Sequence, residues 1–249
     1  FELANKGRLR EKKVLRQQVE RMLQDPRADS FIRNFTVTWL RLDKLGKMPP
    51  EKGGPFRFYH DRKMEPMFVD QAVTFVKDIL QTNKSIRLFI DSDYTYMNEA
   101  IASWIYQRKD INGDTLRKVK LDDPRRGGLF TQPGVMTATS NGVDTTPILR
   151  GVWLLENVLG TPPSPPPPDV EPLAPDLRDA KTIREQLELH RKNEACNSCH
   201  RKIDPMGFAF ESFDPVGRWR THYPKPRLEI DPSTTLSNGD EIPDIVAFK

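Results

Sequence analysis

The residues best suited to chemistry lie in one short stretch, 196–200, which reads Cys-Asn-Ser-Cys-His. Cys196 and Cys199 are the only two cysteines among 249 residues, and His200 follows the second one directly. Cys-x-x-Cys-His is the attachment signature of a c-type haem. On a helical turn, residues three and four positions apart share a face. Both sulfurs and the imidazole would therefore point the same way.

This geometry suits covalent attachment of haem c. The two sulfurs can form thioethers with the vinyl groups at one edge of the porphyrin, and the imidazole can bind the iron from the proximal side. The sequence therefore predicts Cys196 and Cys199 as the attachment points and His200 as an axial iron ligand.

Three other interpretations of this stretch exist. A structural disulfide fits poorly, because this spacing suits a redox-active pair better. A thioredoxin-like site needs a preceding strand and a following helix, whereas residues 187–194 are mostly polar and charged and Asp204-Pro205 soon follows. A zinc knuckle needs a second ligand pair, but His190 and His222 stand alone. We favour haem, with zinc or redox chemistry as the alternatives.

Composition narrows the classes of protein. A length of 249 residues predicts one large domain or two ordinary ones. The 22 prolines predict much loop or extended linker. The net charge is +4 without a basic run, so nothing supports a nucleic-acid partner. The chain contains no apolar span long enough to cross a bilayer, and no signal peptide.

The position of the first residue and the haem motif bear on location. The chain starts at Phe1 in what reads as the interior of a helix, so we expect a mature or trimmed piece of a longer protein. Covalent haem attachment takes place outside the cytoplasm in bacteria. We therefore expect an exported protein, periplasmic or extracellular, and this expectation depends on the haem rather than on disulfides.

The elements that position the motif are expected to be helices. Apolar periodicity predicts helices over residues 1–25, from about 30 to 42, over 65–82 and over 98–106. Residues 1–106 would then form a helical N-terminal domain. The second helix would bury a face made of aromatic and other side chains: Phe31, Phe35, Thr38, Trp39 and Leu42.

The second half predicts a small cytochrome-c-like haem domain over residues 129–225. Residues 107–128, charged and rich in glycine, predict a linker or ragged hairpin before it. The apolar stretch 151–159 predicts a helix that ends at Gly160. Thr182 and Glu185 predict a capping box for a helix that runs to about Arg191.

The remaining segments predict irregular connections. Residues 161–175 begin with Thr161 to Pro168, which carries six prolines, four of them consecutive. Such a segment favours a stiff polyproline strut, with a rise of about 3.1 Å per residue. We favour a spacer over a docking motif. Residues 226–249 would be a tail with a hairpin around Asn238-Gly239, or the start of a third domain. The fold class predicted is mainly α, with long proline-rich connections.

These motifs resemble a known family. The pattern Cys-x-x-Cys-His-x-x-Ile-Asp-Pro-x-Gly-Phe-x-x-Glu-x-Phe-Asp-x-x-Gly-x-x-Arg over residues 196–220 resembles planctomycete-type cytochrome c proteins built from serial domains of unknown function. Residues 129–163 are similar to the same haem-bearing domain, and residues 31–99 to the domain before it. Where the family often has a histidine, this chain has Trp104. The resemblance implies an exported haem protein without an established reaction.

The sixth iron ligand would decide the function. A protein ligand there favours electron transfer, whereas an open site permits peroxide or oxygen chemistry. His190 is the first candidate, because it lies six residues before Cys196 and recurs in the family pattern; a role at the haem edge competes with ligation. Met136, from a loop well separated in sequence, is the alternative. No ligand from this chain is the third case.

Other side chains are candidates for contacts with the haem. Arginine pairs with carboxylates in a fork, so three arginines are candidates for the propionates: Arg150, Arg201 and Arg218. Three phenylalanines are candidates for an apolar pocket wall: Phe208, Phe210 and Phe213.

Three functions follow from these expectations. The first is an electron-transfer module that carries a single haem and serves a redox partner protein the sequence does not identify. The second is a haem enzyme of peroxidase or oxidase type with an open distal site. No distal His/Arg pair has peroxidase spacing, so we prefer the first. The third is a structural subunit of a larger haem-containing assembly.

Overall fold

A computed structural model describes residues 1–165, 181–225 and 227–249. The protein is mainly α-helical, and the described residues contain only two small antiparallel sheets. This confirms the predicted fold class. None of the described helices is both long and apolar enough to cross a membrane. The prediction of a strut over residues 161–175 falls largely on residues outside the description.

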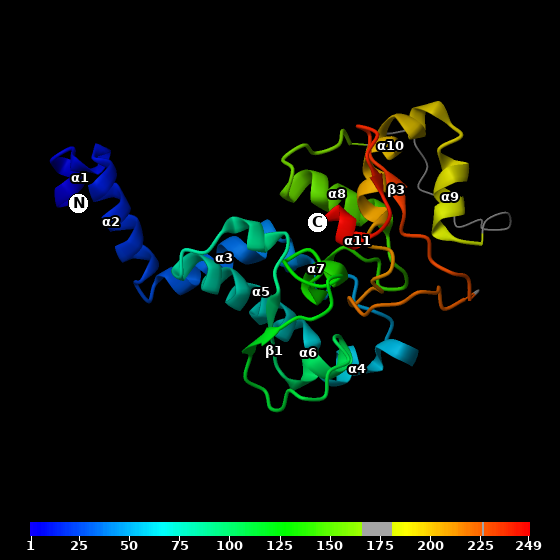
Figure 1. Ribbon diagram of the computed structural model, residues 1–249, viewed down its shortest axis with the longest axis horizontal. Helices are drawn as coiled ribbons and strands as arrows, with labels where there is room; N and C mark the ends of the chain where they lie inside the picture. The colour runs from blue at the N-terminus through cyan, green and yellow to red at the C-terminus, as the bar shows by residue number, and fades with distance from the viewer. Residues whose placement is uncertain (166–180, 226) are drawn as a thin grey trace.

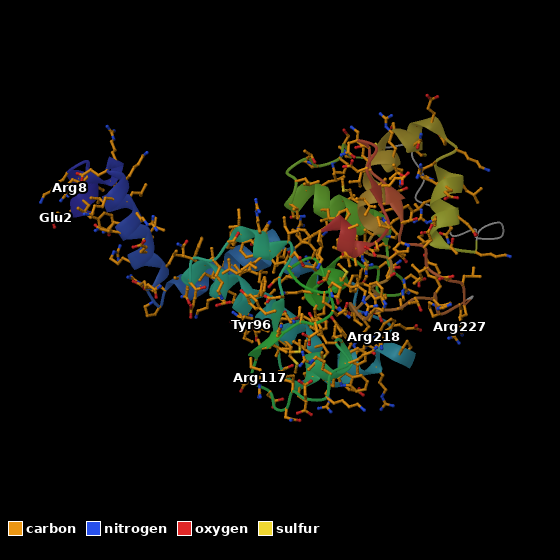
Figure 2. All side chains as sticks on the ribbon, in the orientation of Figure 1. Glu2, Arg8, Tyr96, Arg117, Arg218 and Arg227 are labelled. Atoms are coloured by element: carbon orange, nitrogen blue, oxygen red, sulfur yellow. The ribbon has the colours of Figure 1, made fainter. Side chains whose placement is uncertain are left out.

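An N-terminal arm projects from the body of the molecule (Figure 1). Figure 2 shows Glu2 and Arg8 at its tip. Val14 is buried, but Met22 on the same helix is 61% exposed. The single helix predicted over residues 1–25 is wrong in extent. The arm has three short elements: α1 (Glu2–Asn5), a 3-10 turn (Arg8–Arg10) and α2 (Lys12–Leu23).

Helix α3 (Ala28–Trp39) buries only part of the predicted face: Leu42 just beyond its end is buried, and Trp39 packs against the core. Ile32 and Thr36 are buried, whereas Phe31 and Phe35 are 58% and 43% exposed. The two phenylalanine rings lie against each other on the outer side, with centres 6.1 Å apart. The buried pair and the exposed phenylalanine pair have the same four-residue spacing along the helix. Periodicity alone therefore could not decide which pair faces the core.

Helix α5 (Met64–Gln81) is the central element and confirms the helix predicted over residues 65–82. Its inner face packs against α3 and supplies side chains to the core. The irregular region before it contains only short elements: 3-10 turns over Leu42–Lys44 and Gly54–Phe56, and α4 (Arg57–Asp61).

The predicted linker is partly a strand. β2 (Arg117–Lys120) pairs antiparallel with β1 (Tyr94–Met97), and Tyr94 lies opposite Lys120. The segment 107–128 is thereby tied to the N-terminal region. Two short helical elements flank β1: a 3-10 turn (Ile86–Phe89) and α6 (Glu99–Trp104), which is capped by the side chain of Asn98.

The largest core cluster joins segments from both predicted domains. It includes Ile32 and Phe75 from the first, and Met136, Trp153 and Phe213 from the second. Met136 lies in helix α7 (Pro133–Ala138), where the sequence predicted a loop. All six residues of α7 are buried.

Helices α8 (Pro147–Asn157) and α10 (Glu194–Phe208) cross at very short distance. A Cβ atom on Gly151 would lie 2.1 Å from the carbonyl oxygen of Ile203, and one on Gly207 would lie 1.9 Å from that of Pro147. Only glycine allows the two backbones to approach in this way. The crossing fixes α8 beside the cysteine motif.

The C-terminal segment returns to the body. β3 (Thr234–Thr235) and β4 (Glu241–Ile242) pair antiparallel, which confirms the hairpin predicted around Asn238-Gly239. Helix α11 (Ile245–Phe248) ends with Phe248 against Phe210, with ring centres 5.3 Å apart.

Candidate haem-attachment site

Helix α10 carries the whole Cys-x-x-Cys-His motif. The side chain of Asn193 caps its first turn by accepting a hydrogen bond from the backbone N–H of Ala195, at 3.0 Å. The helix continues through Pro205, although proline removes a backbone donor at that position. The two cysteines and His200 therefore lie on one continuous helix, with the spacing that the motif requires.

Both cysteines and His200 line one cavity of about 270 Å³. Cys196 and Cys199 are free thiols. The opposite wall comes from α8, whose residues at four-residue spacing face the same space: Ile148, Val152 and Glu156. These α8 residues were not recognised from the sequence, although their spacing of four along an apolar helix is a signal that could have indicated them.

The imidazole of His200 is held from one side. Its Nδ1 atom lies 2.9 Å from Oδ1 of Asp204, one helical turn further along α10. A carboxylate oxygen opposite Nδ1 favours the tautomer that carries its proton on Nδ1 and its lone pair on Nε2. Neutral imidazole with this tautomer is the form that binds a metal through Nε2.

His190 is the last residue of α9 (Ile183–His190) and lines the same cavity. The cap of α9 confirms the prediction for its start, because Thr182 accepts from the N–H of Glu185 at 3.2 Å. The rings of His190 and His200 lie 4.8 Å apart at 73°. Burial, and then the nearby His200, lower the pKa of His190, so its neutral form dominates at neutral pH.

The spacing of the two imidazoles is too short for an iron between them. Two metal–nitrogen bonds of about 2.0 Å each, plus the depth of each ring, would separate the ring centres by about 6 Å. The observed separation is 4.8 Å. Ligation by both histidines therefore requires the end of α9 to move outward.

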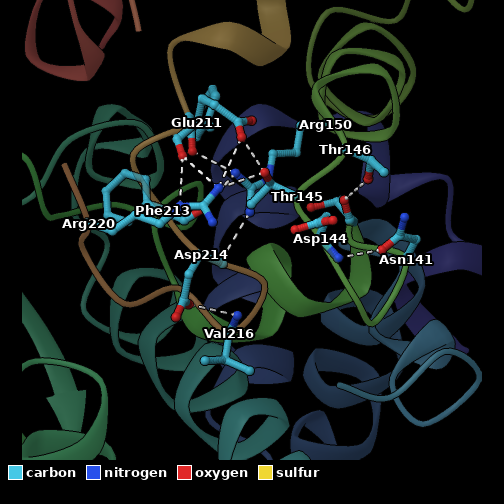
Figure 3. A network of polar contacts seen from close by, with 12 residues as sticks. Asn141, Asp144, Thr145, Thr146, Arg150, Glu211, Phe213, Asp214, Val216 and Arg220 are labelled. Atoms are coloured by element: carbon cyan, nitrogen blue, oxygen red, sulfur yellow. Dashed lines mark hydrogen bonds and ion pairs between the residues drawn. The ribbon is translucent and has the colours of Figure 1, made fainter. Parts of the chain in front are cut away.

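Arg150, a candidate for the haem propionates, instead donates hydrogen bonds to backbone carbonyls away from the cysteine cavity. Its Nη1 atom donates to the carbonyls of Phe210 and Phe213, at 2.6 and 2.9 Å, and Nη2 donates to that of Asp214 at 3.2 Å (Figure 3). Burial lowers the pKa of Arg150 to about 10, so it stays cationic at neutral pH. The side chain holds the chain after α10 and does not line the cysteine cavity.

The other predicted contacts also lie away from the cavity lining. Arg218 donates to Asp214 at 2.7 Å, and Arg201 is exposed. Phe208 is buried beneath the guanidinium of Arg184, 4.0 Å from its ring centre. Met136 is buried in the core. The structure thus brings together the three motif residues and His190, but not these four.

A buried polar network was missed at the sequence level. Glu211 lies 3.0 Å from Nη2 of Arg220, and the hydroxyl of Thr145 donates to the same carboxylate (Figure 3). Burial raises the pKa of Glu211, against the pull of the nearby arginines. The family pattern contains Glu211 and Arg220, but spacing alone could not pair them with Thr145. The network fastens the chain after α10 to the segment before α8.

The donor set fits haem c better than the alternatives. Two free thiols and a held imidazole face an apolar helix wall, as thioether attachment and axial ligation require. The cavity is slightly smaller than the range of about 300–1,000 Å³ typical of ligand pockets, so the described residues would enclose a porphyrin only in part. Within the described chain, no three His, Cys, Asp or Glu side chains are grouped closely enough to hold a metal ion.

Comparisons with known families agree with the two halves of the chain. Residues 1–107 match the family model PSD4, described as a protein of unknown function (DUF1592), and residues 126–223 match PSCyt3, described as a protein of unknown function (DUF1588). The first half of the chain is thus similar to a DUF1592 domain, and the second half to a DUF1588 domain. Both are planctomycete cytochrome-like domain names, so the resemblance is confirmed at this level. No curated protein and no solved structure matches the chain.

Proposed function

We propose that the chain is an exported c-type haem protein that passes single electrons to or from a partner protein. The observation that carries this proposal is the shared cavity of Cys196, Cys199 and His200, with both sulfurs free. The name PSCyt3 of the matched family model supports a cytochrome-like function for the DUF1588 half. Attachment of haem c outside the cytoplasm accounts for export.

Each side chain has a role in this proposal. With haem c bound, the sulfurs of Cys196 and Cys199 would hold it through two thioethers, and Nε2 of His200 would bind its iron. Ile148 and Val152 on α8 exclude water from one face. A bound haem supplies a one-electron iron couple. The crossing of α8 and α10 holds the apolar wall and the ligand in fixed relation, which keeps reorganisation small.

His190 is the proposed sixth ligand, after an outward movement of the end of α9. The second candidate function, a haem enzyme with an open distal position, is favoured by one observation. The 4.8 Å separation of the two imidazoles leaves no room for an iron between them as they lie. If the end of α9 moves aside without His190 binding the iron, an exchangeable site would remain open to peroxide or oxygen.

The first experiment tests attachment. The chain is produced in the periplasm of a bacterial host with the haem c maturation proteins, beside the double variant Cys196→Ser/Cys199→Ser. Ser198→Ala is the matched control, because Ser198 lies between the cysteines and is exposed. Intact mass should show one covalent haem in the parent chain and in the control, and none in the double variant. A parent chain that matures without added haem mass contradicts the proposal.

The second experiment separates the two functions. Electron transfer predicts a low-spin spectrum in both oxidation states that carbon monoxide and cyanide do not change. His190→Ala should then become high-spin and bind carbon monoxide. A parent protein that is already high-spin and reacts with peroxide would instead favour the enzyme.

A further inference from the structure

Asp204 is an acidic side chain in direct contact with the proposed iron ligand, His200. Its Oδ1 atom lies 2.9 Å from Nδ1 of His200. The Asp204 side chain is completely buried, whereas that of His200 is 15% exposed. The pair therefore lies where α10 passes from its open end into the core.

The other oxygen of this carboxylate is also buried. Oδ2 of Asp204 has no hydrogen-bond partner among the described residues. A buried carboxylate without further donors interacts strongly with the one group that it faces, because the local dielectric is low. Its principal partner is thus the imidazole N–H of His200.

The crossing of α8 and α10 keeps this contact in place. Ile203, next to Asp204, lies against Gly151, and Gly207 lies against Pro147. Neither backbone can move closer to the other at these two points without a clash. The helix segment that carries Asp204 is therefore closely packed against α8, and the His200 ring cannot turn without breaking the bond to Oδ1.

We propose that Asp204 is a positioning residue that holds the proton of His200 on Nδ1, presents Nε2 to the iron and favours the oxidised state. This inference rests on the proposed function, because it gives the proximal ligand its orientation and basicity. A carboxylate bonded to the far nitrogen makes a ligating imidazole more basic. A more basic ligand and a nearby negative charge stabilise ferric iron more than ferrous iron, which lowers the reduction potential.

The test compares the parent haem protein with Asp204→Asn, which keeps the shape and removes the charge. The equilibrium should shift about tenfold toward the reduced state, a rise of about 59 mV for a one-electron couple. Asp204→Glu keeps the charge, so its reduction potential should lie between those of the parent protein and Asp204→Asn. Glu194→Gln is the matched control, because it removes an exposed charge from the same helix and solvent screens its effect.

A second measurement does not need haem. Histidine ¹⁵N spectra of the chain produced without maturation should show His200 with its proton on Nδ1, and Asp204→Asn should move it toward Nε2. A parent His200 protonated on Nε2 overturns the inference, as does an unchanged potential in Asp204→Asn. Failure of the parent chain to take up haem contradicts the proposed function alone, and the ¹⁵N comparison still decides the role of Asp204.

Discussion

The two halves of α10 differ in their surroundings. Residues 194–202 are exposed or half-buried and carry both cysteines and His200. From Ile203 to Phe208, all side chains but one are buried, and the buried run continues to Gly217. The first half carries the two thiols and the imidazole, and its side chains are only loosely packed. The second half has many contacts and no thiol.

This difference shows how one helix meets two demands. Attachment of a large group needs open space around the thiols, which a packed core cannot give. A defined ligand geometry needs a support whose side chains are locked by packing. Continuity of α10 lets the buried half position the open half, and Asp204 with His200 spans the boundary. The comparison predicts large effects on stability at the buried end and small ones at the open end.

The largest loss is expected for Arg150→Ala. The variant leaves three buried carbonyls without their donor and creates a cavity, so the free energy of unfolding should fall by about 3–5 kcal/mol. Arg33→Ala is the control, because Arg33 pairs with Asp70 and both side chains are 50% exposed. The control should change stability by less than about 1 kcal/mol. Denaturant unfolding measures both, and equal losses would break the comparison.

Gly151→Ala should have the next largest effect. Its Cβ atom would lie 2.1 Å from the carbonyl oxygen of Ile203, so α8 must move away from α10. Overpacking of this kind costs about 1–3 kcal/mol of unfolding free energy. Gly53→Ala is the control, because no atom lies within 4 Å of the added carbon. A Gly151→Ala protein as stable as the control would mean that the crossing is not tight.

Glu211 should give stability a dependence on pH. Burial raises its pKa in the folded chain, so the folded state binds the proton more tightly than the unfolded state. This contribution is present below the unfolded value of about 4.3 and is lost as the pH rises through the folded pKa. Its slope is at most about 1.4 kcal/mol per pH unit. Glu211→Gln removes the contribution, and parallel pH curves for the two proteins would contradict the prediction.

The smallest effect is expected for Asn193→Ala at the open end. Loss of the side-chain cap on α10 should lower the free energy of unfolding by about 1 kcal/mol. Asn193→Asp keeps the acceptor and should retain the stability. Hydrogen exchange of the Ala195 amide should report local fraying in the alanine variant alone. A loss of stability as large as that of Arg150→Ala would contradict the comparison, because the open end of α10 would then matter to the whole fold.

Local patterns could be predicted because they depend on neighbouring residues. The helix over residues 65–82, the cap at Thr182 and the hairpin around Asn238-Gly239 all follow from short-range rules and are confirmed. The face of α3 was predicted only in part, because two stripes of equal spacing compete and the packing against α5 decides which one is covered. The strand within residues 107–128 needed its partner β1, which lies more than ten residues earlier.

In the candidate site, too, short-range spacing could be predicted from the sequence and long-range contacts could not. The sequence by itself determined that two thiols and an imidazole share one helix face, because helical geometry fixes residues three and four apart. Only the tertiary structure decided that His190 lies against His200, that α8 supplies the opposite wall, and that Arg150 donates to carbonyls sixty or more residues away rather than facing the cavity. Those contacts join segments distant along the chain, and their choice depends on how the whole core packs.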